Sequence, residues 1–316
     1  MLVSTRIAAS VPDPERFRRP NSGALIMLVI KVPSDLGPAW GGADAACASD
    51  NPSMSSFDSG SLAAPVEAVK TSPRVVLRAM RSWAGPFEPV YAKVLPVNSR
   101  CIEAVCAWIA LQVELPVPRP MLLTMPASRM PRGLQWPFGS EPQAIVFATR
   151  AIDGALPLSR ISSEASWNLI DRWDALPAAA VFDQLVANDD RTDGNILLGP
   201  RRDLWLIDHA RSLGGGGQRL FSTDVTPRFE NFFLSRIAGL PLKERQRLRP
   251  SLMAVCARLG GLVPRVPYGS LLVPDDISMQ IDDFLQRRLV TLQATVLQAV
   301  GLPDLYDNGD APRALQ

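Results

Sequence analysis

Two carboxylates and a carboxamide fall close together in one part of the chain. Asp190 and Asn195 begin and end the polar segment Asp-Arg-Thr-Asp-Gly-Asn, and Asp208 follows thirteen residues later, after an apolar run. Oxygen groups of this kind suit Mg²⁺, which takes one or two protein ligands and completes its octahedron with water and phosphate oxygens. The remaining carboxylate can orient an attacking hydroxyl or accept its proton, because phosphoryl transfer depends mainly on positioning and charge neutralisation. These residues therefore predict a magnesium-dependent phosphotransfer site.

The segments on either side of this loop predict that the three side chains meet. Residues 177–187 indicate a helix, with a proline in its first turn and apolar residues at helical spacing. Residues 196–198 and 204–207 are apolar runs on either side of a Gly-Pro turn, which is typical of a hairpin. A hairpin returns Asp208 to the side of Asn195. A short Asp/Asn/Gly stretch alone is most often a surface loop, so it is the complete order of elements that favours the metal site.

The same residues resemble those of a known kinase family. Residues 188–198 and 206–209 look like the catalytic and metal-binding segments of HipA-like kinases and, more distantly, of phosphatidylinositol kinases with a protein-kinase-like fold. The resemblance implies that Asp190 is the catalytic aspartate and that Asn195 and Asp208 hold Mg²⁺.

A kinase needs a lysine on an upstream strand and a glutamate on the helix that follows. Residues 90–94 alternate and favour a strand, and Lys93 stands where the family's ATP-binding lysine would neutralise nucleotide phosphates. Residues 102–109 show an apolar helical stripe with Glu103 on the adjacent face, which makes Glu103 the candidate partner of Lys93. An ordinary solvated helix glutamate is the alternative for Glu103.

The adenine of ATP would be bordered by the hinge of such a fold. The sequence Leu-Pro-Val-Pro at residues 115–118 ends the preceding helix in an extended path, and relatives commonly show a similar sequence here. The apolar run at residues 144–149 then predicts a buried strand leading to the hinge, so Phe147, Ala148 and Thr149 are expected beside the adenine. A plain core strand fits the run equally well.

The phosphate-binding loop is the part of the kinase pattern with the fewest matching residues. Gly85 is the single glycine just before the lysine strand and is the candidate phosphate contact, although one glycine does not establish a cradle of backbone amides. Four glycines at residues 214–217 predict a flexible linker like an activation segment. Thr192 stands where relatives often have His, and Ala210 replaces the Gly of the protein-kinase Asp-Phe-Gly.

Composition agrees with a globular enzyme and gives no indication of nucleic-acid binding. The 316 residues are 47% hydrophobic, and 33 basic against 31 acidic residues leave a net charge of +2 without a basic block interleaved with aromatics. The four cysteines form no CxxC pair, which favours reduced, mostly buried thiols in a cytoplasmic protein. His209 is the only histidine and is expected to have a structural role beside the metal site.

The predicted fold is α+β and two-lobed, like that of protein kinases. Residues 73–150 would form a small β-rich N-lobe and residues 151–316 a mainly helical C-lobe, while the Pro-, Ser- and Ala-rich residues 1–72 would form a loosely ordered extension. An apolar run at residues 24–30 is too short to span a membrane, which takes about 20 residues. Translation starting at Met54 is a further hypothesis for this extension.

The sequence predicts further helices of the C-lobe before and after the catalytic loop. Trp167 belongs to one that begins at Ser162 or Ser163, and Arg287 with Arg288 is interpreted as a surface pair. The other predicted helices cover residues 229–238, 242–259 and 276–300.

Three functions remain open from the sequence. The first is an ATP-dependent kinase that uses ATP and Mg²⁺ to phosphorylate a hydroxyl, with Ser or Thr of a protein as the expected acceptor. Some members of the wider family are toxins of toxin–antitoxin pairs, so the resemblance also implies a possible antitoxin or regulatory partner. The second is a small-molecule or lipid kinase, and the third is a non-catalytic binding module that keeps the fold.

Overall fold

The computed structural model describes residues 58–70, 75–82, 88–215 and 230–302 of the chain. The predictions made for residues 1–57, including the start at Met54, lie outside these residues. The same holds for Gly85 and for Gly216 and Gly217 of the glycine run.

Five strands close into a barrel in the order β1-β2-β3-β5-β4. The strands are β1 (Asp58–Lys70), β2 (Val75–Ser82), β3 (Glu88–Val94), β4 (Pro120–Pro126) and β5 (Gln143–Arg150). Neighbouring strands are antiparallel except β1 and β4, whose parallel pairing closes the barrel. Closure pairs the edges that an open sheet would leave unbonded. Apolar side chains fill the inside, among them Leu77, Ala92, Met121, Val146 and Ala148.

The barrel begins earlier than the sequence indicates. The strands predicted at residues 90–94 and 144–149 are confirmed as β3 and β5. The folded region was expected to start at residue 73, whereas β1 already begins at Asp58 and pairs with both β2 and β4. Small and polar residues dominate β1, and strand formation in such a segment depends on its neighbours more than on its own composition.

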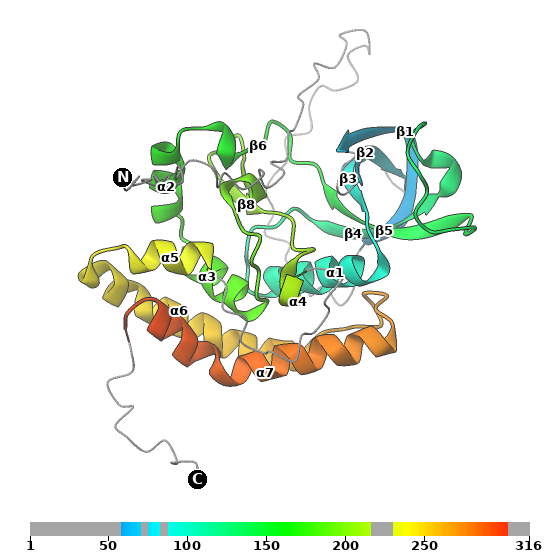
Figure 1. Cartoon of the computed structure of the whole chain (residues 1–316). Helices are drawn as coiled ribbons and strands as arrows, with labels where there is room; N and C mark the ends of the chain where they lie inside the picture. Colours follow the sequence, from blue (N-terminus) through cyan, green and yellow to red (C-terminus); the bar gives the residue numbers. More distant parts are fainter. Residues whose placement is uncertain (1–57, 71–74, 83–87, 216–229, 303–316) are drawn as a thin grey trace, which may run out of the picture.

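Helices make up most of the remainder, and α1, α6 and α7 form layers beneath the barrel (Figure 1). Helix α1 lies between the barrel and α7, and α6 packs along α7 (Figure 1). The helices are α1 (Val97–Gln112), α2 (Ser163–Asp171), α3 (Leu176–Leu185), α4 (Ser212–Gly215), α5 (Phe232–Ala238), α6 (Leu242–Leu262) and α7 (Asp275–Ala299). All helices predicted within the described residues are present, with ends that differ by a few residues. No helix of the described residues is long and apolar enough to cross a membrane.

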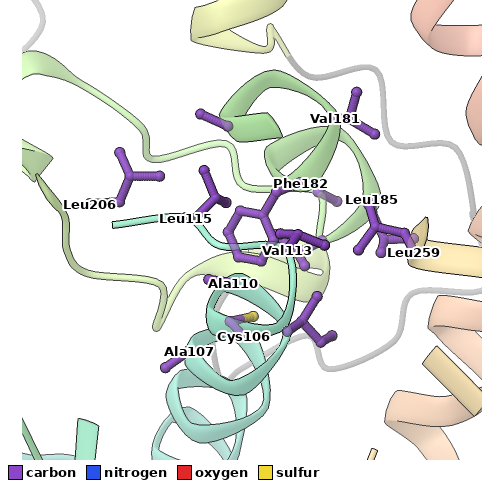
Figure 2. Packing of buried hydrophobic residues seen from close by; sticks show 14 of the residues in the cluster. Cys106, Ala107, Ala110, Val113, Leu115, Val181, Phe182, Leu185, Leu206 and Leu259 are labelled. Atoms are coloured by element: carbon purple, nitrogen blue, oxygen red, sulfur yellow. The ribbon is translucent and has the colours of Figure 1, made fainter. Parts of the chain in front are cut away.

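The helical core is centred on the contact between α1 and α3. Figure 2 shows Phe182 of α3 packed close to Cys106 and Ala110 of α1 and to Leu115, which follows that helix. Most residues of α1 are buried, including both neighbours of Glu103. A helix that is apolar around most of its circumference belongs inside a protein, so α1 joins the barrel to the other helices.

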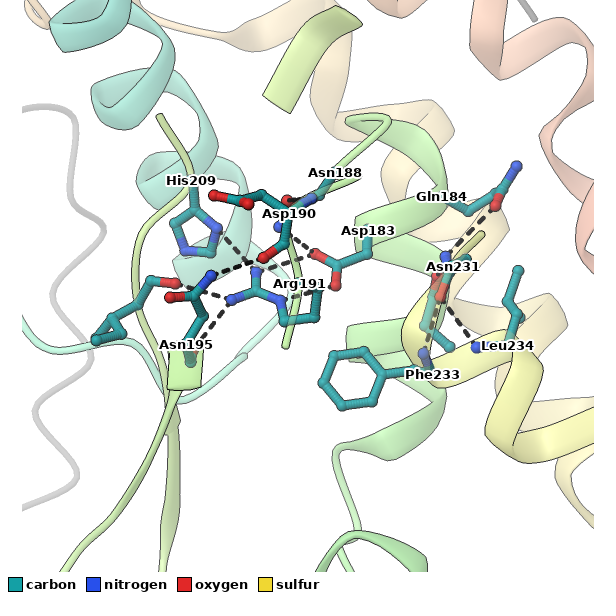
Figure 3. A network of polar contacts seen from close by, with 12 residues as sticks. Asp183, Gln184, Asn188, Asp190, Arg191, Asn195, His209, Asn231, Phe233 and Leu234 are labelled. Carbon is teal, nitrogen blue, oxygen red and sulfur yellow. Dashed lines mark hydrogen bonds and ion pairs between the residues drawn. The ribbon is translucent and has the colours of Figure 1, made fainter. Parts of the chain in front are cut away.

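Side-chain caps fix where α2 and α5 begin. Ser162 accepts a hydrogen bond from Ala165 N at 3.3 Å, as predicted for the start of α2. Asn231 Oδ1 accepts from the first backbone amides of α5, and its Nδ2 donates to Ala180 O of α3 at 2.9 Å (Figure 3). The same side chain therefore starts α5 and attaches it to α3.

Arg288 of α7 does not lie on the surface. Its side chain is 7% exposed and donates to the carbonyl oxygens of Gln184 and Leu185, the latter at 2.8 Å. The last carbonyls of α3 lack partners within the helix, and a cation there also opposes the negative end of the helix dipole. The interpretation of Arg287 and Arg288 as a surface pair was thus wrong for Arg288, because two adjacent arginines on a helix point in different directions.

The predicted hairpin is present as part of a second, three-stranded sheet of β6 (Leu156–Pro157), β7 (Ile196–Leu198) and β8 (Leu204–Leu206). Ile196 pairs with Leu206 across the antiparallel hairpin. Asn195 just before β7 and Asp208 just after β8 are therefore brought to the same end of this sheet.

Candidate active site

An apolar pocket lies between the barrel and the hairpin. It is lined by Val69 of β1 and Val76 of β2 from the barrel and by Leu197 and Leu206 from the hairpin. Val117 and Pro118, from the Leu-Pro-Val-Pro sequence, also line it. The charged side chains of Lys93, Glu103 and Asp208 lie together with His209 at its polar end. A mostly apolar pocket with a few converging polar groups is typical of a small-molecule site.

The hinge residues predicted from the sequence face two different ways. Phe147 and Thr149 line the pocket, whereas the side chain of Ala148 lies in the barrel interior. Successive side chains of a strand point to opposite faces, so the three could not all border the same ligand through their side chains.

Lys93 is held between two carboxylates. It forms an ion pair with Glu103, and its Nζ also lies 3.2 Å from Asp208 Oδ1. Burial acts to lower the pKa of Lys93, but the carboxylates of Asp208 and Glu103 outweigh it and hold the pKa above its ordinary value. The lysine therefore stays charged, and strand β3, helix α1 and the segment after β8 meet at one ammonium group.

Glu103 is buried rather than solvated, with 1% of its side chain exposed. One carboxylate oxygen faces Lys93, and the other accepts a hydrogen bond from the backbone N–H of His209 at 3.1 Å. The alternative of an ordinary solvated helix glutamate does not describe this side chain. Glu103 positions both the lysine and the backbone next to Asp208.

Asp208 has a backbone conformation that is uncommon for a residue with a side chain. Its φ of 62° lies in the left-handed region, which non-glycine residues rarely adopt and which is frequent at functional sites. The turn lets β8 end at Leu206 while the Asp208 carboxylate reaches Lys93.

Asn195 is oriented by the loop that contains Asp190. Its Nδ2 donates to the backbone oxygen of Asp190 at 2.7 Å. Because only the nitrogen of a carboxamide can donate, the Asn195 amide oxygen faces away from that carbonyl. The Asp190 carboxylate lies 3.0 Å from Arg211, a half-exposed residue of the segment that follows Asp208.

The donor chemistry of Asn195 and Asp208 fits a magnesium ion. Within the described part of the chain, no three His, Cys, Asp or Glu side chains come together as a metal site. An amide oxygen and a carboxylate nevertheless match the one or two protein ligands that Mg²⁺ takes when phosphates and water supply the others.

A buried ion pair between the loop that contains Asp190 and helix α3 holds the loop in place. The sequence did not indicate this pair. The side chain of Arg191 is 1% exposed and makes a two-point contact with the carboxylate of Asp183 in α3, at 2.9 and 3.0 Å (Figure 3). Asp183 also accepts from Asn188 Nδ2, and Asn188 Oδ1 accepts from the backbone N–H of Asp190. An Asp inside the apolar run Ala-Ala-Ala-Val-Phe-Asp is the signal that could have identified Asp183, because an unpaired charge is rarely buried.

The ring of His209 is buried between Arg191 and Phe182. Arg191 donates to its Nδ1 at 3.1 Å, which leaves the imidazole proton on Nε2, since a guanidinium cannot accept. Its ring also packs edge-on to Phe182 at a centroid distance of 5.4 Å. Burial, together with the charges of Arg191 and Lys93, lowers the pKa of His209 well below its ordinary value.

Gly214 and Gly215, which belong to the glycine run predicted as a linker, are the last two residues of the short helix α4. Gly214 has a φ of 93° and the preceding Leu213 a φ of 61°, so the backbone is not regularly helical there. Leu213 N donates to Val186 O at 2.6 Å, which fastens this segment to the end of α3.

Comparison with known proteins identifies the fold but not a family. No protein-family model matches the chain, and no curated protein matches its sequence. The structure is similar to the crystal structure of a Helicobacter pylori proinflammatory kinase CtkA, with a TM-score of 0.50 and 11% sequence identity over 77% of this chain and 98% of that chain. At this identity the similarity concerns the fold alone. The chain thus has a mixed α/β, kinase-like fold with a strand-rich part and a mainly helical part.

Proposed function

We propose that this protein is an ATP-dependent phosphotransferase whose barrel and helical part act as the N-lobe and C-lobe of a kinase. The observation that carries the proposal is the position of Lys93 between Glu103 and Asp208 at the polar end of the pocket. A buried ion pair is weak evidence for stability, because desolvation offsets most of its attraction. Its use here would be to present a fixed positive charge to nucleotide phosphates.

The apolar part of the pocket would hold the base of the nucleotide. Val69 and Val76 of the barrel line it together with Leu197 and Leu206 of the hairpin, and a flat purine ring suits such an apolar lining. Phe147 and Thr149 complete the pocket along β5. The base would then lie at the apolar end, with the phosphates directed toward Lys93.

Asn195 and Asp208 would hold Mg²⁺ through the amide oxygen and the carboxylate. Bound there, Mg²⁺ would neutralise charge on the phosphates of the nucleotide. The chain itself fixes the directions of both groups through the hydrogen bond from Asn195 to Asp190 O and the contact between Asp208 and Lys93.

Asp190 would orient the acceptor hydroxyl and accept its proton. Its carboxylate is partly exposed and lies on the loop that Asn195 braces. As the acceptor we propose a Ser or Thr hydroxyl of a protein, because residues 188–198 resemble the corresponding segment of HipA-like kinases.

Transfer of labelled phosphate tests this function. Wild-type protein, Asp190→Asn and Asp208→Asn are incubated with γ-labelled ATP and Mg²⁺ in the presence of protein mixtures and of small-molecule acceptors. Asp276→Asn, an exposed aspartate at the start of α7, is the matched control. We expect transfer to protein by the wild type and the control, and a loss of about 100-fold or more in the two site variants. Transfer that both site variants retain, or its absence from the wild type with every acceptor, would overturn the proposal.

A further inference from the structure

Arg191 contacts the backbone of Asn195 and both neighbours of Asp208, without touching the side chains of the two proposed metal-binding residues. One terminal nitrogen, Nη1, donates to Asn195 O at 3.2 Å and to Ile207 O at 2.8 Å. The other, Nη2, lies 3.1 Å from His209 Nδ1. Arg191 therefore contacts the residue before Asp208, the residue after it, and Asn195 itself (Figure 3).

These contacts lie where the hairpin ends. The last ladder pair before the site is Ile196 with Leu206, and one more backbone bond joins Ile207 N to Asn195 O at 3.1 Å. Beyond it the chain turns at Asp208, whose φ is 62°. Past that point no strand pairing joins the segment before β7 to the segment after β8. The guanidinium of Arg191 joins them instead, through Asn195 O, Ile207 O and the His209 ring.

The five N–H donors of the Arg191 side chain all have acceptors. Nε and one donor of Nη2 bind the two oxygens of Asp183, and the other three reach Asn195 O, Ile207 O and His209 Nδ1. A lysine has three donors on one atom and cannot reproduce this planar arrangement. The Asp183 carboxylate compensates the charge, so the guanidinium can remain inside the protein.

We infer that Arg191 is a positioning residue that sets the spacing between Asn195 and Asp208, so that both oxygens address a single Mg²⁺. This inference rests on the proposed function, because it concerns the residues that would hold that ion. Groups that orient metal ligands without binding the metal typically contribute about 10- to 100-fold to metal affinity. Arg191 has no contact with Lys93 or with the Glu103 side chain that pairs with it, so Lys93 keeps one of its two carboxylate partners whatever happens to Asp208.

The test compares nucleotide affinity with and without Mg²⁺. The Kd of the non-hydrolysable analogue AMP-PNP is measured by calorimetry in MgCl₂ and in EDTA, and the ratio of the two values is the magnesium coupling. For wild type we expect tighter binding with Mg²⁺. For Arg191→Lys we expect the coupling to fall by about 10-fold or more, while the Kd in EDTA changes by less than about twofold.

Arg236→Lys is the matched control. Arg236 of α5 also makes a two-point contact with a carboxylate, that of Asp171, but it does not line the proposed nucleotide pocket and contacts neither Asn195 nor the residues next to Asp208. We expect its magnesium coupling to equal that of the wild type. A loss of coupling in both variants would show a general effect of weakened helix packing and would overturn the specific role of Arg191.

A second variant covers the case in which Arg191→Lys does not fold. Asp183→Leu/Arg191→Met replaces both charges by apolar side chains, an exchange that buried ion pairs often tolerate. We expect this variant to fold, to bind AMP-PNP in EDTA and to have lost the coupling. Full coupling in either folded variant overturns the inference but leaves the proposed function intact. Wild type that binds AMP-PNP equally well with and without Mg²⁺ overturns the proposed function, and the inference with it.

Discussion

The carboxylate of Asp183 accepts two hydrogen bonds from the guanidinium of Arg191, at 2.9 and 3.0 Å, and neither side chain is more than 1% exposed. The contact joins the middle of the helical core to the loop that contains Asp190. Helix α3 therefore contributes to the site as well as to the core, because its only carboxylate, Asp183, binds Asn188 and Arg191 of the loop.

The Asp183–Arg191 pair predicts an asymmetric effect on stability. Removing one partner leaves an uncompensated buried charge, so Asp183→Ala should lower the free energy of unfolding by about 3–5 kcal/mol. The double variant Asp183→Leu/Arg191→Met should lose markedly less, since no charge stays buried. Urea unfolding followed by circular dichroism measures both. Equal losses in the single and double variants would contradict a compensated buried pair.

The only histidine of the chain should remain neutral below its ordinary pKa. The pKa of His209 is lowered well below 6.5 in the folded protein, whereas the unfolded chain binds a proton near 6.5. As the pH falls below 6.5 the unfolded state gains a proton that the folded state does not, so His209 contributes a loss of stability of up to about 1.4 kcal/mol per pH unit. The loss stops once the pH passes the folded pKa.

Two measurements check this behaviour. Imidazole NMR of the native protein should show one neutral histidine with its proton on Nε2 as the pH is lowered through 6.5. The stability difference between wild type and His209→Gln should shrink over the same range. A histidine signal that titrates at 6.5 in the folded protein would show that Arg191 does not donate to its ring.

Lys93 should contribute to phosphate binding and not to base binding. Lys93→Met removes the ammonium group that Glu103 and Asp208 hold at the polar end of the pocket. Loss of a hydrogen bond to a charged group costs about 1.5–3 kcal/mol, so the Kd for ATP should rise by about 10- to 100-fold. Adenosine has no phosphates, and its Kd should not change. Equal losses for ATP and adenosine would indicate that the substitution deforms the whole pocket.

Phe182 should be among the side chains that contribute most to stability. This residue of α3 is fully buried against α1 (Figure 2), and its ring also packs edge-on to that of His209. Phe182→Ala should lower the free energy of unfolding by about 3–5 kcal/mol. Val290 is 85% exposed, and Val290→Ala should change stability by less than about 0.5 kcal/mol. A small effect of Phe182→Ala would contradict the packing around α3.

The parts of the fold that the sequence predicted are those with a strong local pattern. The hairpin around the Gly-Pro turn and the long apolar stripe of α7 could be predicted because each depends on its own residues. Strand β1 and the closure of the barrel could not, since pairing of β1 with β4 joins segments far apart in the sequence. Non-local pairing leaves no periodicity within a single segment.

The same distinction holds at the site. Spacing was sufficient to propose that Lys93 and Glu103 meet, because one strand and the next helix position both. The roles of Asp183 and Arg288 were missed, as each depends on which face of a helix meets a neighbour from another part of the chain. The expectation that Ala148 borders the base stays a prediction that concerns its backbone, since strand alternation turns its side chain into the barrel.

Magnesium-dependent binding of ATP tests the central claim most directly. Calorimetric titration of ATP into wild type in the presence of Mg²⁺ should show one site per chain. Chelation of Mg²⁺ by EDTA and the substitution Asp208→Asn should each weaken that binding by about 10-fold or more. Wild type that binds no ATP with Mg²⁺ present, or Asp208→Asn that binds it as tightly as wild type, would contradict the assignment of this pocket as a magnesium-nucleotide site.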